Sequence, residues 1–229
     1  AVNDVALDLK RGEVHAVIGT NGAGKSTLIN ILSGEIPPSA GTVQLLGQDV
    51  TAWSQPKRAR AGLGRSYQRN TIYPGFSVLE NCRLAAQAST QKPWHWWQPA
   101  SGCVASNTAA RAAAGRAGLN DVLERPAGLL SHGQKRQLEI AMCLATAPQV
   151  LLLDEPLAGM GAEETERMLA LLGELKARHA ILLVEHDMDA VFRIADTITV
   201  MVNGSVIASG NPDFVRNSRE VQAAYLGGH

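Results

Sequence analysis

The fold is decided by nine residues, Gly19-Thr20-Asn21-Gly22-Ala23-Gly24-Lys25-Ser26-Thr27. They match the pattern G-x-x-x-x-G-K-(S/T) at every fixed position. The apolar and β-branched stretch before them predicts a strand, and the apolar stretch after them predicts a helix that ends at Gly34. Such a loop turns successive backbone N–H groups toward a phosphate, and the helix start adds free N–H groups and a positive dipole end. We therefore predict a phosphate-binding loop over residues 19–27, called the phosphate loop below. The alternative is an ordinary glycine-rich turn before a helix.

Two side chains of the phosphate loop have a predicted chemical role. Lys25 can reach the terminal phosphates of a nucleotide, and the Ser26 hydroxyl can ligate Mg²⁺. The other members contribute mainly their backbone; they are Gly19, Thr20, Asn21, Gly22, Ala23, Gly24 and Thr27.

Composition narrows the class of protein. The chain has 229 residues, which fits one large domain or one domain with an insert. Its formal net charge is zero, so no global field attracts it to nucleic acid or to an anionic membrane. Its apolar runs are far too short to span a bilayer. Three cysteines without metal-ligand spacing indicate free thiols in a reducing compartment.

The start of the chain alternates polar and apolar residues over positions 1–9. This alternation predicts a strand whose beginning lies upstream, and because there is no initiating Met we expect the chain to be a fragment. Residues 10–13 then predict a hairpin turn into the strand before the phosphate loop.

The segment after the first helix predicts two further strands. One covers residues 42–46 and ends at Gly47, and the other covers residues 62–67. Gln68 follows the second, and a polar side chain at a strand end in an α/β sheet is well placed to face a ligand. By itself, Gln68 would be an ordinary surface amide.

The strand pattern stops between residues 74 and 130, where residues 78–87 and 107–118 are alanine-rich and predict helices. Between them lie Trp94, His95, Trp96 and Trp97. These tryptophans either pack on the helices of this insert or contact a partner, since Trp is enriched in interface hot spots. A base-stacking platform is disfavoured because basic residues are not interleaved.

A second helix start follows at Leu130-Ser131-His132-Gly133-Gln134, called the signature segment below. Apolar residues then recur with helical spacing, and Ser131 is a natural N-cap. A serine hydroxyl and a glycine at a helix start offer a second potential phosphate site. The alternative is simply a capped amphipathic helix.

Carboxylates and a histidine follow the next two predicted strands, residues 150–153 and 181–184. After the first, Asp154 can hold Mg²⁺ through its water shell and Glu155 can polarise an attacking water; alternatively, one of them caps the next helix. After the second, His186 can hydrogen-bond a terminal phosphate, or it can be a structural histidine. The tail predicts strands over residues 197–202 and 205–209, joined by a turn at Asn203-Gly204, and then short helices.

In this order the motifs resemble those of ATP-binding-cassette (ABC) ATPases. The Walker A loop corresponds to residues 19–27, the Q-loop to Gln68, the signature to residues 130–134, the Walker B strand and its glutamate to residues 150–155, and the switch histidine to His186. The resemblance covers nearly the whole chain. Stretches such as Val184-Glu185-His186-Asp187-Met188 resemble the branch that serves importers of branched-chain amino acids, urea or amides.

The resemblance implies a fold and a site. The expected fold is an α/β P-loop NTPase of ABC type, with a mixed core sheet, an antiparallel β subdomain and a helical subdomain. Residues 1–73 and 146–229 would form the nucleotide-binding core and residues 74–145 the helical subdomain. The expected catalytic residues are Glu155, His186 and Gln68, and the expected metal ligands are Ser26, Gln68 and Asp154. ATP would also contact a partner's Ser131, Gly133 and Gln134.

The resemblance also implies cofactors and partners. ATP and Mg²⁺ are the expected cofactors. Two ATPase subunits, identical or paralogous, would pair head to tail around two ATP molecules and move two membrane-spanning permease subunits that dock near the Q-loop. A solute-binding protein would take part indirectly, with no role for nucleic acid. The chain would lie peripherally on the cytoplasmic face of a membrane, in bacteria the inner one.

Three departures from the family pattern affect these expectations. His132 replaces the first glycine of L-S-G-G-Q and could crowd the partner's nucleotide or add a cation at low pH. Gly161 stands where the loop after Walker B usually has an aspartate, which bears on communication between the two sites. The aromatic residue that stacks on adenine, together with its strand, is expected upstream of residue 1, so we expect weak ATP binding with little preference for adenine.

Other classes of function are weighed against these motifs. A GTPase would show N-K-x-D, which is absent. A DNA-repair or chromosome-associated ABC ATPase would have a long coiled-coil insert, whereas only about sixty residues without sustained heptads separate Gln68 from Ser131. A catalytically weakened or silent regulatory cassette stays open because of His132 and Gly161. The sequence does not name a transported solute.

Overall fold

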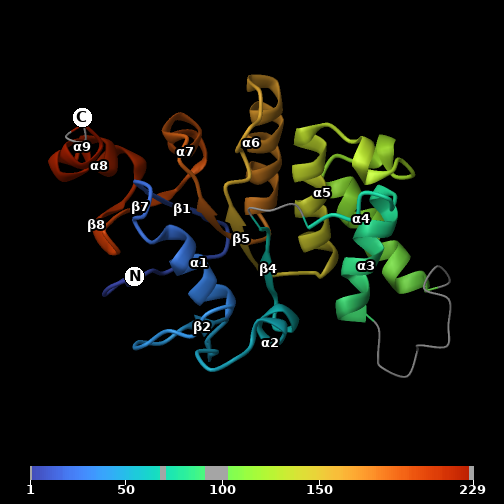
Figure 1. Ribbon diagram of the computed structural model, residues 1–229, viewed down its shortest axis with the longest axis horizontal. Helices are drawn as coiled ribbons and strands as arrows, with labels where there is room; N and C mark the ends of the chain where they lie inside the picture. The colour runs from blue at the N-terminus through green and yellow to red at the C-terminus, as the bar shows by residue number, and fades with distance from the viewer. Residues whose placement is uncertain (1, 68–70, 91–102, 227–229) are drawn as a thin grey trace.

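The computed structural model describes residues 2–67, 71–90 and 103–226 (Figure 1). Its centre is a sheet with the strand order β4-β5-β6-β1-β7-β8, beside a two-stranded hairpin of β2 and β3. In the large sheet, β4, β5, β6, β1 and β7 run parallel, and β8 is antiparallel to β7. The strands are β1 (Val14–Gly19), β2 (Gln44–Leu45), β3 (Gln48–Asp49), β4 (Leu63–Arg65), β5 (Val150–Asp154), β6 (Ala180–Val184), β7 (Thr197–Val202) and β8 (Ser205–Gly210).

Helices cover both faces of this sheet, as connections between parallel strands require. In Figure 1, α1 and α2 lie on one side of the strands, and α6 and α7 lie on the other. The α-helices are α1 (Lys25–Ser33), α2 (Gln55–Arg60), α3 (Val78–Thr90), α4 (Val104–Arg116), α5 (His132–Ala145), α6 (Ala162–Lys176), α7 (Met188–Ile194), α8 (Pro212–Asn217) and α9 (Arg219–Leu226). The α/β fold with a mixed sheet that the sequence predicts is confirmed.

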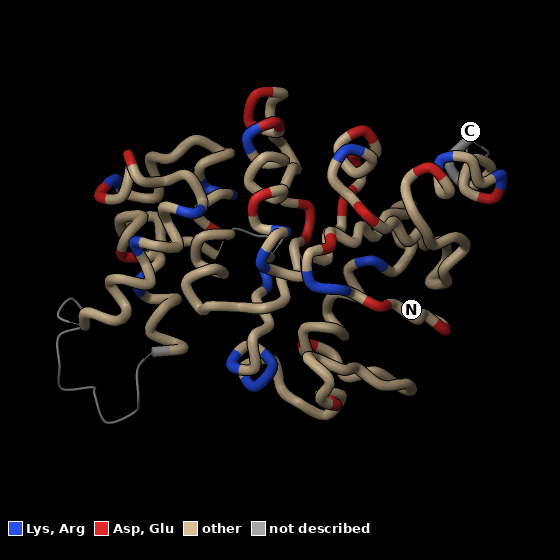
Figure 2. Tube along the Cα trace, turned by 180° about the vertical axis from the view of Figure 1, so that it is seen from behind, with Lys and Arg blue, Asp and Glu red and all other residues tan. Residues whose placement is uncertain are grey.

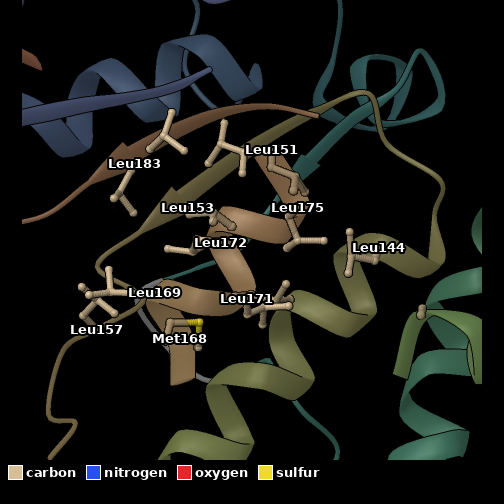
Figure 3. Close-up of a cluster of buried hydrophobic side chains, with 14 of the residues drawn as sticks. Leu144, Leu151, Leu153, Leu157, Met168, Leu169, Leu171, Leu172, Leu175 and Leu183 are labelled. Carbon is tan, nitrogen blue, oxygen red and sulfur yellow. The ribbon is translucent and has the colours of Figure 1, made fainter. Parts of the chain in front are cut away.

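The two faces of the sheet are buried by alternate residues of the same strands. Leu151 and Leu153 of β5 pack with Leu172 of α6 in one cluster, and Figure 3 shows these side chains pointing toward one another. Leu152 points to the opposite face and packs with Ile29 of α1. A strand buried on both faces needs a continuous apolar run, which is why residues 150–153 are all Val or Leu.

Helices α3, α4 and α5 form a helical unit that packs beside the sheet (Figure 1). They share a cluster that includes Val78, Cys82, Ala110, Ala114 and Leu138. Small alanines let these helices approach closely, which explains the alanine-rich sequence. The predicted helices over residues 78–87 and 107–118 therefore exist, with bounds shifted by a few residues. The division of the chain at residues 74 and 145 stays a prediction.

The predicted strand over residues 1–9 is wrong for residues 2–9, which form no strand. Isolated hydrogen bonds, such as Asn3 N–H to the Gly204 carbonyl at 2.8 Å, join this segment to its neighbours. Val5, Leu7 and Leu9 are partly buried against the α1 face of the sheet. The alternation therefore records side-chain packing without a strand ladder. The predicted turn is present, with the Glu13 N–H bonded to the Lys10 carbonyl, but it is not a hairpin turn, because no strand precedes it.

The predicted strand over residues 42–46 is shorter than expected. Leu46 and Gly47 both have positive φ, +51° and +78°, so the chain reverses there and Gln44–Leu45 pairs with Gln48–Asp49. The second strand of this hairpin was not predicted. The predicted turn at Asn203-Gly204 is confirmed, with φ of +49° and +87°, and joins β7 to β8.

The charges of both signs are distributed over both halves of the fold (Figure 2), in line with the zero net charge. Among the described residues, none of the helices is long and apolar enough to cross a membrane. Trp94, His95, Trp96 and Trp97 lie outside the described residues, so the two interpretations of this cluster stay open.

Candidate nucleotide site

The phosphate loop joins the end of β1 at Gly19 to the start of α1 at Lys25. Gly22 and Gly24 have φ of +80° and +101°, values that residues with a side chain rarely adopt. At Gly19, a Cβ atom would lie 2.3 Å from the Met201 carbonyl oxygen, so only glycine fits beside β7. No side chain caps the start of α1, and its first N–H groups therefore remain suited to an anion.

The ammonium group of Lys25 is folded back over the phosphate loop. Its Nζ donates to the Gly19 carbonyl at 2.7 Å and to the Thr20 carbonyl at 3.2 Å. Burial lowers the pKa of Lys25, while the carboxylates of Glu155 and Asp154 act in the opposite direction. Lys25 therefore places a cation within the loop. When a phosphate binds, the ammonium group can leave these two neutral carbonyl acceptors and donate to a charged phosphate oxygen instead.

The sheet order brings the predicted residues to one edge. Strands β5, β6 and β1 are parallel neighbours, with Asp154 opposite Val184 and Val184 opposite Val17. The carboxylates after β5, His186 after β6 and the phosphate loop after β1 thus follow the same ends of adjacent strands. In open α/β sheets this edge is where ligands bind. Gln68 lies outside the described residues, and β4, which precedes it, pairs with β5 at the same edge.

Asp154 is a buried carboxylate at this edge. Asp154 is 5% exposed. Burial raises the pKa of Asp154, and the nearby charge of Glu155 acts in the same direction with a smaller effect. Arg65 and Lys25 act against that shift. Ser26 is exposed on the first turn of α1. A hydroxyl and a carboxylate are hard oxygen donors of the kind that Mg²⁺ takes alongside water and nucleotide phosphates.

This donor set is small, as expected for a metal held partly by a nucleotide. Among the described residues, no group of three or more His, Cys, Asp or Glu side chains could hold a metal ion. A site with one carboxylate and one hydroxyl therefore suits Mg²⁺ bound together with phosphates, and not a metal held by the protein alone.

Glu155 and His186 lie close together in the loops that follow the paired strands β5 and β6. The distance from His186 Nδ1 to Glu155 Oε1 is 4.0 Å. Glu155 has φ of +49°, a strained value that concentrates at functional sites. The Glu155 side chain is 24% exposed and that of His186 is 62% exposed, so both can meet solvent or a ligand.

Glu185, which directly follows β6 and precedes His186, was not singled out from the sequence. It is fully buried, and its Oε1 accepts a hydrogen bond from the Leu157 N–H at 2.8 Å. Its Oε2 accepts from the His186 N–H at 3.2 Å. A carboxylate that directly follows an apolar strand was the available signal, and the same signal identified Asp154.

The signature segment begins α5 with a capping box. Ser131 Oγ accepts from the Gln134 N–H at 3.2 Å, and Gln134 Oε1 accepts from the Ser131 N–H at 3.1 Å. The predicted N-cap at Ser131 is therefore confirmed. The spacing of the apolar residues predicts a start near Gln134, whereas the helix starts two residues earlier, at His132.

A carboxylate from α6 lies on the same helix start. Glu164 Oε1 accepts from Ser131 Oγ–H at 3.1 Å and from the Gly133 N–H at 3.2 Å. The hydrogen bond from the Ser131 hydroxyl, together with those from backbone N–H groups, lowers the pKa of Glu164. Ser131, Gly133 and Gln134 thus line a pocket with residues of α6. The donors of the signature segment therefore already hold an anionic oxygen in this chain. The contact of Glu164 with Ser131 was not predicted from the sequence, because the two residues are far apart in the chain.

The two departures from the family pattern lie beside this pocket. His132 is exposed, and its Cε1 would be 3.3 Å from a Cβ atom on Gly159. The imidazole therefore lies against the loop after β5 of its own chain. Gly161 is the N-cap of α6 and makes no side-chain cap, because glycine has none.

Comparison with known proteins agrees with this geometry. Residues 2–158 match the family described as ABC transporter, and residues 205–229 match the family described as Branched-chain amino acid ATP-binding cassette transporter. The LivG high-affinity branched-chain amino acid transport ATP-binding protein of Salmonella typhimurium is 39% identical over 235 residues, covering 99% of this chain and 92% of the relative. The BraF protein of Pseudomonas aeruginosa, of the same description, is 36% identical over 251 residues with the same coverage.

A solved structure extends the likeness to three dimensions. The ADP conformation of MJ1267, an ATP-binding cassette of an ABC transporter, superposes with a TM-score of 0.89 at 30% identity. The match covers 99% of this chain and 92% of that one. The family match spans more than half of the chain and the curated relatives cover nearly all of it. The chain therefore belongs to the ABC transporter family of ATP-binding proteins.

Proposed function

We propose that this chain is the Mg²⁺-dependent ATPase subunit of an importer for branched-chain amino acids or related small polar or amide solutes. The observation that carries the proposal is the shared strand edge of β1, β5 and β6. It brings Lys25, Asp154, Glu155 and His186 together from positions up to 161 residues apart. The names of LivG and BraF support the solute class.

The phosphate loop binds the phosphates of ATP in this proposal. Its backbone N–H groups and Lys25 hold the β- and γ-phosphates. Ser26 and Asp154 hold Mg²⁺, with Gln68 as a further ligand. When bound, Mg²⁺ neutralises charge on the phosphate oxygens.

Hydrolysis uses residues in the loops that follow β5 and β6. Glu155 orients and polarises the attacking water and accepts its proton. His186 and Gln68 hydrogen-bond the γ-phosphate and fix it in line with the water. His186 Nδ1 lies 4.0 Å from Glu155 Oε1, which supports the proposal that both groups contact one ligand.

Two ATPase subunits, identical or paralogous, pair head to tail in this proposal. The signature segment of one subunit contacts the γ-phosphate bound to the other. The Ser131 and Gly133 donors that now hold the Glu164 carboxylate support an anion at this position. Closure of the pair moves two permease subunits at the cytoplasmic face of the membrane, and a solute-binding protein delivers the solute.

A proteoliposome experiment tests the importer. The chain is reconstituted with the permease subunits and binding protein encoded beside it, and uptake of radiolabelled leucine is compared with uptake of urea. We expect leucine uptake that requires internal ATP and Mg²⁺ and stops on chelation. ATP hydrolysis without uptake of either solute would contradict the importer. The alternative of a silent cassette rests on His132 and Gly161, the departures from the family pattern, and it predicts no hydrolysis at all.

A further inference from the structure

Glu185 joins the two loops that carry Glu155 and His186. Its Oε1 holds the backbone of Leu157, two residues after Glu155, and its Oε2 holds the backbone of His186 itself. The same Oε2 lies 3.9 Å from the Nδ1 of His186. One side chain thus contacts both the loop after β5 and the loop after β6.

This arrangement is costly for folding. Glu185 is fully buried, and a buried carboxylate loses the hydration that it has in water. Burial raises the pKa of Glu185, and the nearby charge of Glu155 acts in the same direction, while the two N–H donors oppose the shift. Stability alone would be served by an apolar residue here, as at the four preceding positions of β6.

The structure around Glu155 needs an external support. Its φ of +49° is strained for a residue with a side chain, and strained backbone persists only where its surroundings hold it. The loop is held by the Glu155 N–H bond to the Val184 carbonyl, by the Ala158 N–H bond to the Glu155 carbonyl and by the Glu185 bond to Leu157. The last of these bonds is made by a side chain, so a substitution can remove it.

We infer that Glu185 is a positioning residue, which sets the relative placement of Glu155 and His186 by binding the backbone of both loops. It touches neither ATP nor water in this inference and acts through its two neighbours. The inference rests on the proposed ATPase function. A displacement of about 1 Å at a reacting group can lower turnover by roughly a hundredfold.

The test compares Glu185→Gln with wild type in the full chain. The amide keeps one oxygen for Leu157, but its NH₂ group cannot accept from the His186 N–H. We expect kcat to fall by roughly ten- to hundredfold. ATP affinity should stay within about twofold of wild type, because the phosphate loop is unchanged. Ile181→Val is the matched control: it makes a small cavity in the same strand, and its kcat should stay near wild type.

A double-mutant cycle separates positioning from general damage. If Glu185 acts through His186, then Glu185→Gln should lower kcat much less in a His186→Ala background than in wild type. Effects that simply multiply, or an affinity loss that parallels the kcat loss, would overturn the inference. So would an unchanged kcat. If Glu185→Gln does not fold, Glu185→Asp is measured by the same criteria.

The failure of the proposed function would be visible separately. Turnover that survives Glu155→Gln would remove the hydrolytic assignment and this inference with it. Turnover that is lost in Glu155→Gln but kept in Glu185→Gln would overturn the positioning role alone.

Discussion

Removing the negative charge of Glu164 should make the signature segment easier for a partner's ATP to reach. In the single chain, Glu164 Oε1 occupies two donors at the start of α5, the Ser131 hydroxyl and the Gly133 N–H. The proposed dimer needs the same donors for a γ-phosphate. Glu164→Gln leaves a neutral oxygen in place of a carboxylate and also removes its repulsion of the incoming phosphate.

The expected size of the effect follows from the number and kind of these bonds. Hydrogen bonds to an ionised acceptor are roughly twice as strong as neutral ones, and two of them must be released. We therefore expect the ATP concentration at half-maximal dimer formation to fall by roughly three- to tenfold. Light scattering during an ATP titration measures this midpoint, in a Glu155→Gln background that prevents hydrolysis.

A neighbouring carboxylate provides the control for Glu164→Gln. Glu163 lies in the same helical turn and pairs with the exposed Arg167, so Glu163→Gln should leave the midpoint unchanged. The pKa of Glu164 is lowered in the folded chain. Its stabilising contact is therefore complete above the unfolded pKa of about 4.3 and is lost only as the pH falls through the lower folded value. The ratio of the two midpoints should be constant from about pH 6 to 9. Equal midpoints for Glu164→Gln and Glu163→Gln would refute the reasoning.

Two further predictions concern the phosphate loop and an exposed pair of aromatic residues. Gly19→Ala places a Cβ 2.3 Å from a backbone carbonyl oxygen and should cost about 1–3 kcal/mol, a Tm loss of several degrees. In Gly75→Ala the added Cβ has no atom within 4 Å, so this variant should melt like wild type. Equal melting of the two variants would contradict the packing. Tyr73 and Phe76 are 54% and 43% exposed with ring centroids 5.6 Å apart. The sequence favours the surface from Arg69 to Phe76, directly after Gln68, as the docking site of the permease subunits, with Ile72 and Tyr73 as the residues to replace. Ile72 packs on the helical unit, so Tyr73 and Phe76 are replaced with Ser instead. Transport should be uncoupled while basal ATPase survives, and unchanged transport would place permease docking elsewhere.

The site elements that could be predicted from the sequence are those in which neighbouring residues carry the signal. The phosphate loop, the capping serine at Ser131 and the carboxylates after residues 150–153 each combine a local geometric requirement with a chemical one. The meeting of the phosphate loop and these carboxylates at one edge follows from the rule that parallel strands end on the same side. Glu164 and Glu185 could not be assigned in this way, because their partners at Ser131 and Leu157 are set by tertiary packing.

The errors have equally physical causes. The alternation over residues 2–9 is real, but alternation reports a two-sided environment and not a hydrogen-bonded neighbour. The turn at Leu46-Gly47 was not predicted because leucine rarely adopts a φ such as the +51° of Leu46. Predicted strands with continuous apolar runs, such as residues 181–184, were located within one residue because burial on both faces leaves no alternative.

The central claim, that Glu155 drives ATP hydrolysis at this strand edge, is tested most directly by comparing binding and turnover in one variant. Glu155→Gln keeps the size of the side chain and removes the base. We expect ATP affinity within about threefold of wild type, and a kcat that is lower by roughly a hundredfold or more. Measured by nucleotide titration and by phosphate release on the same preparation, near-normal turnover in Glu155→Gln would contradict the account.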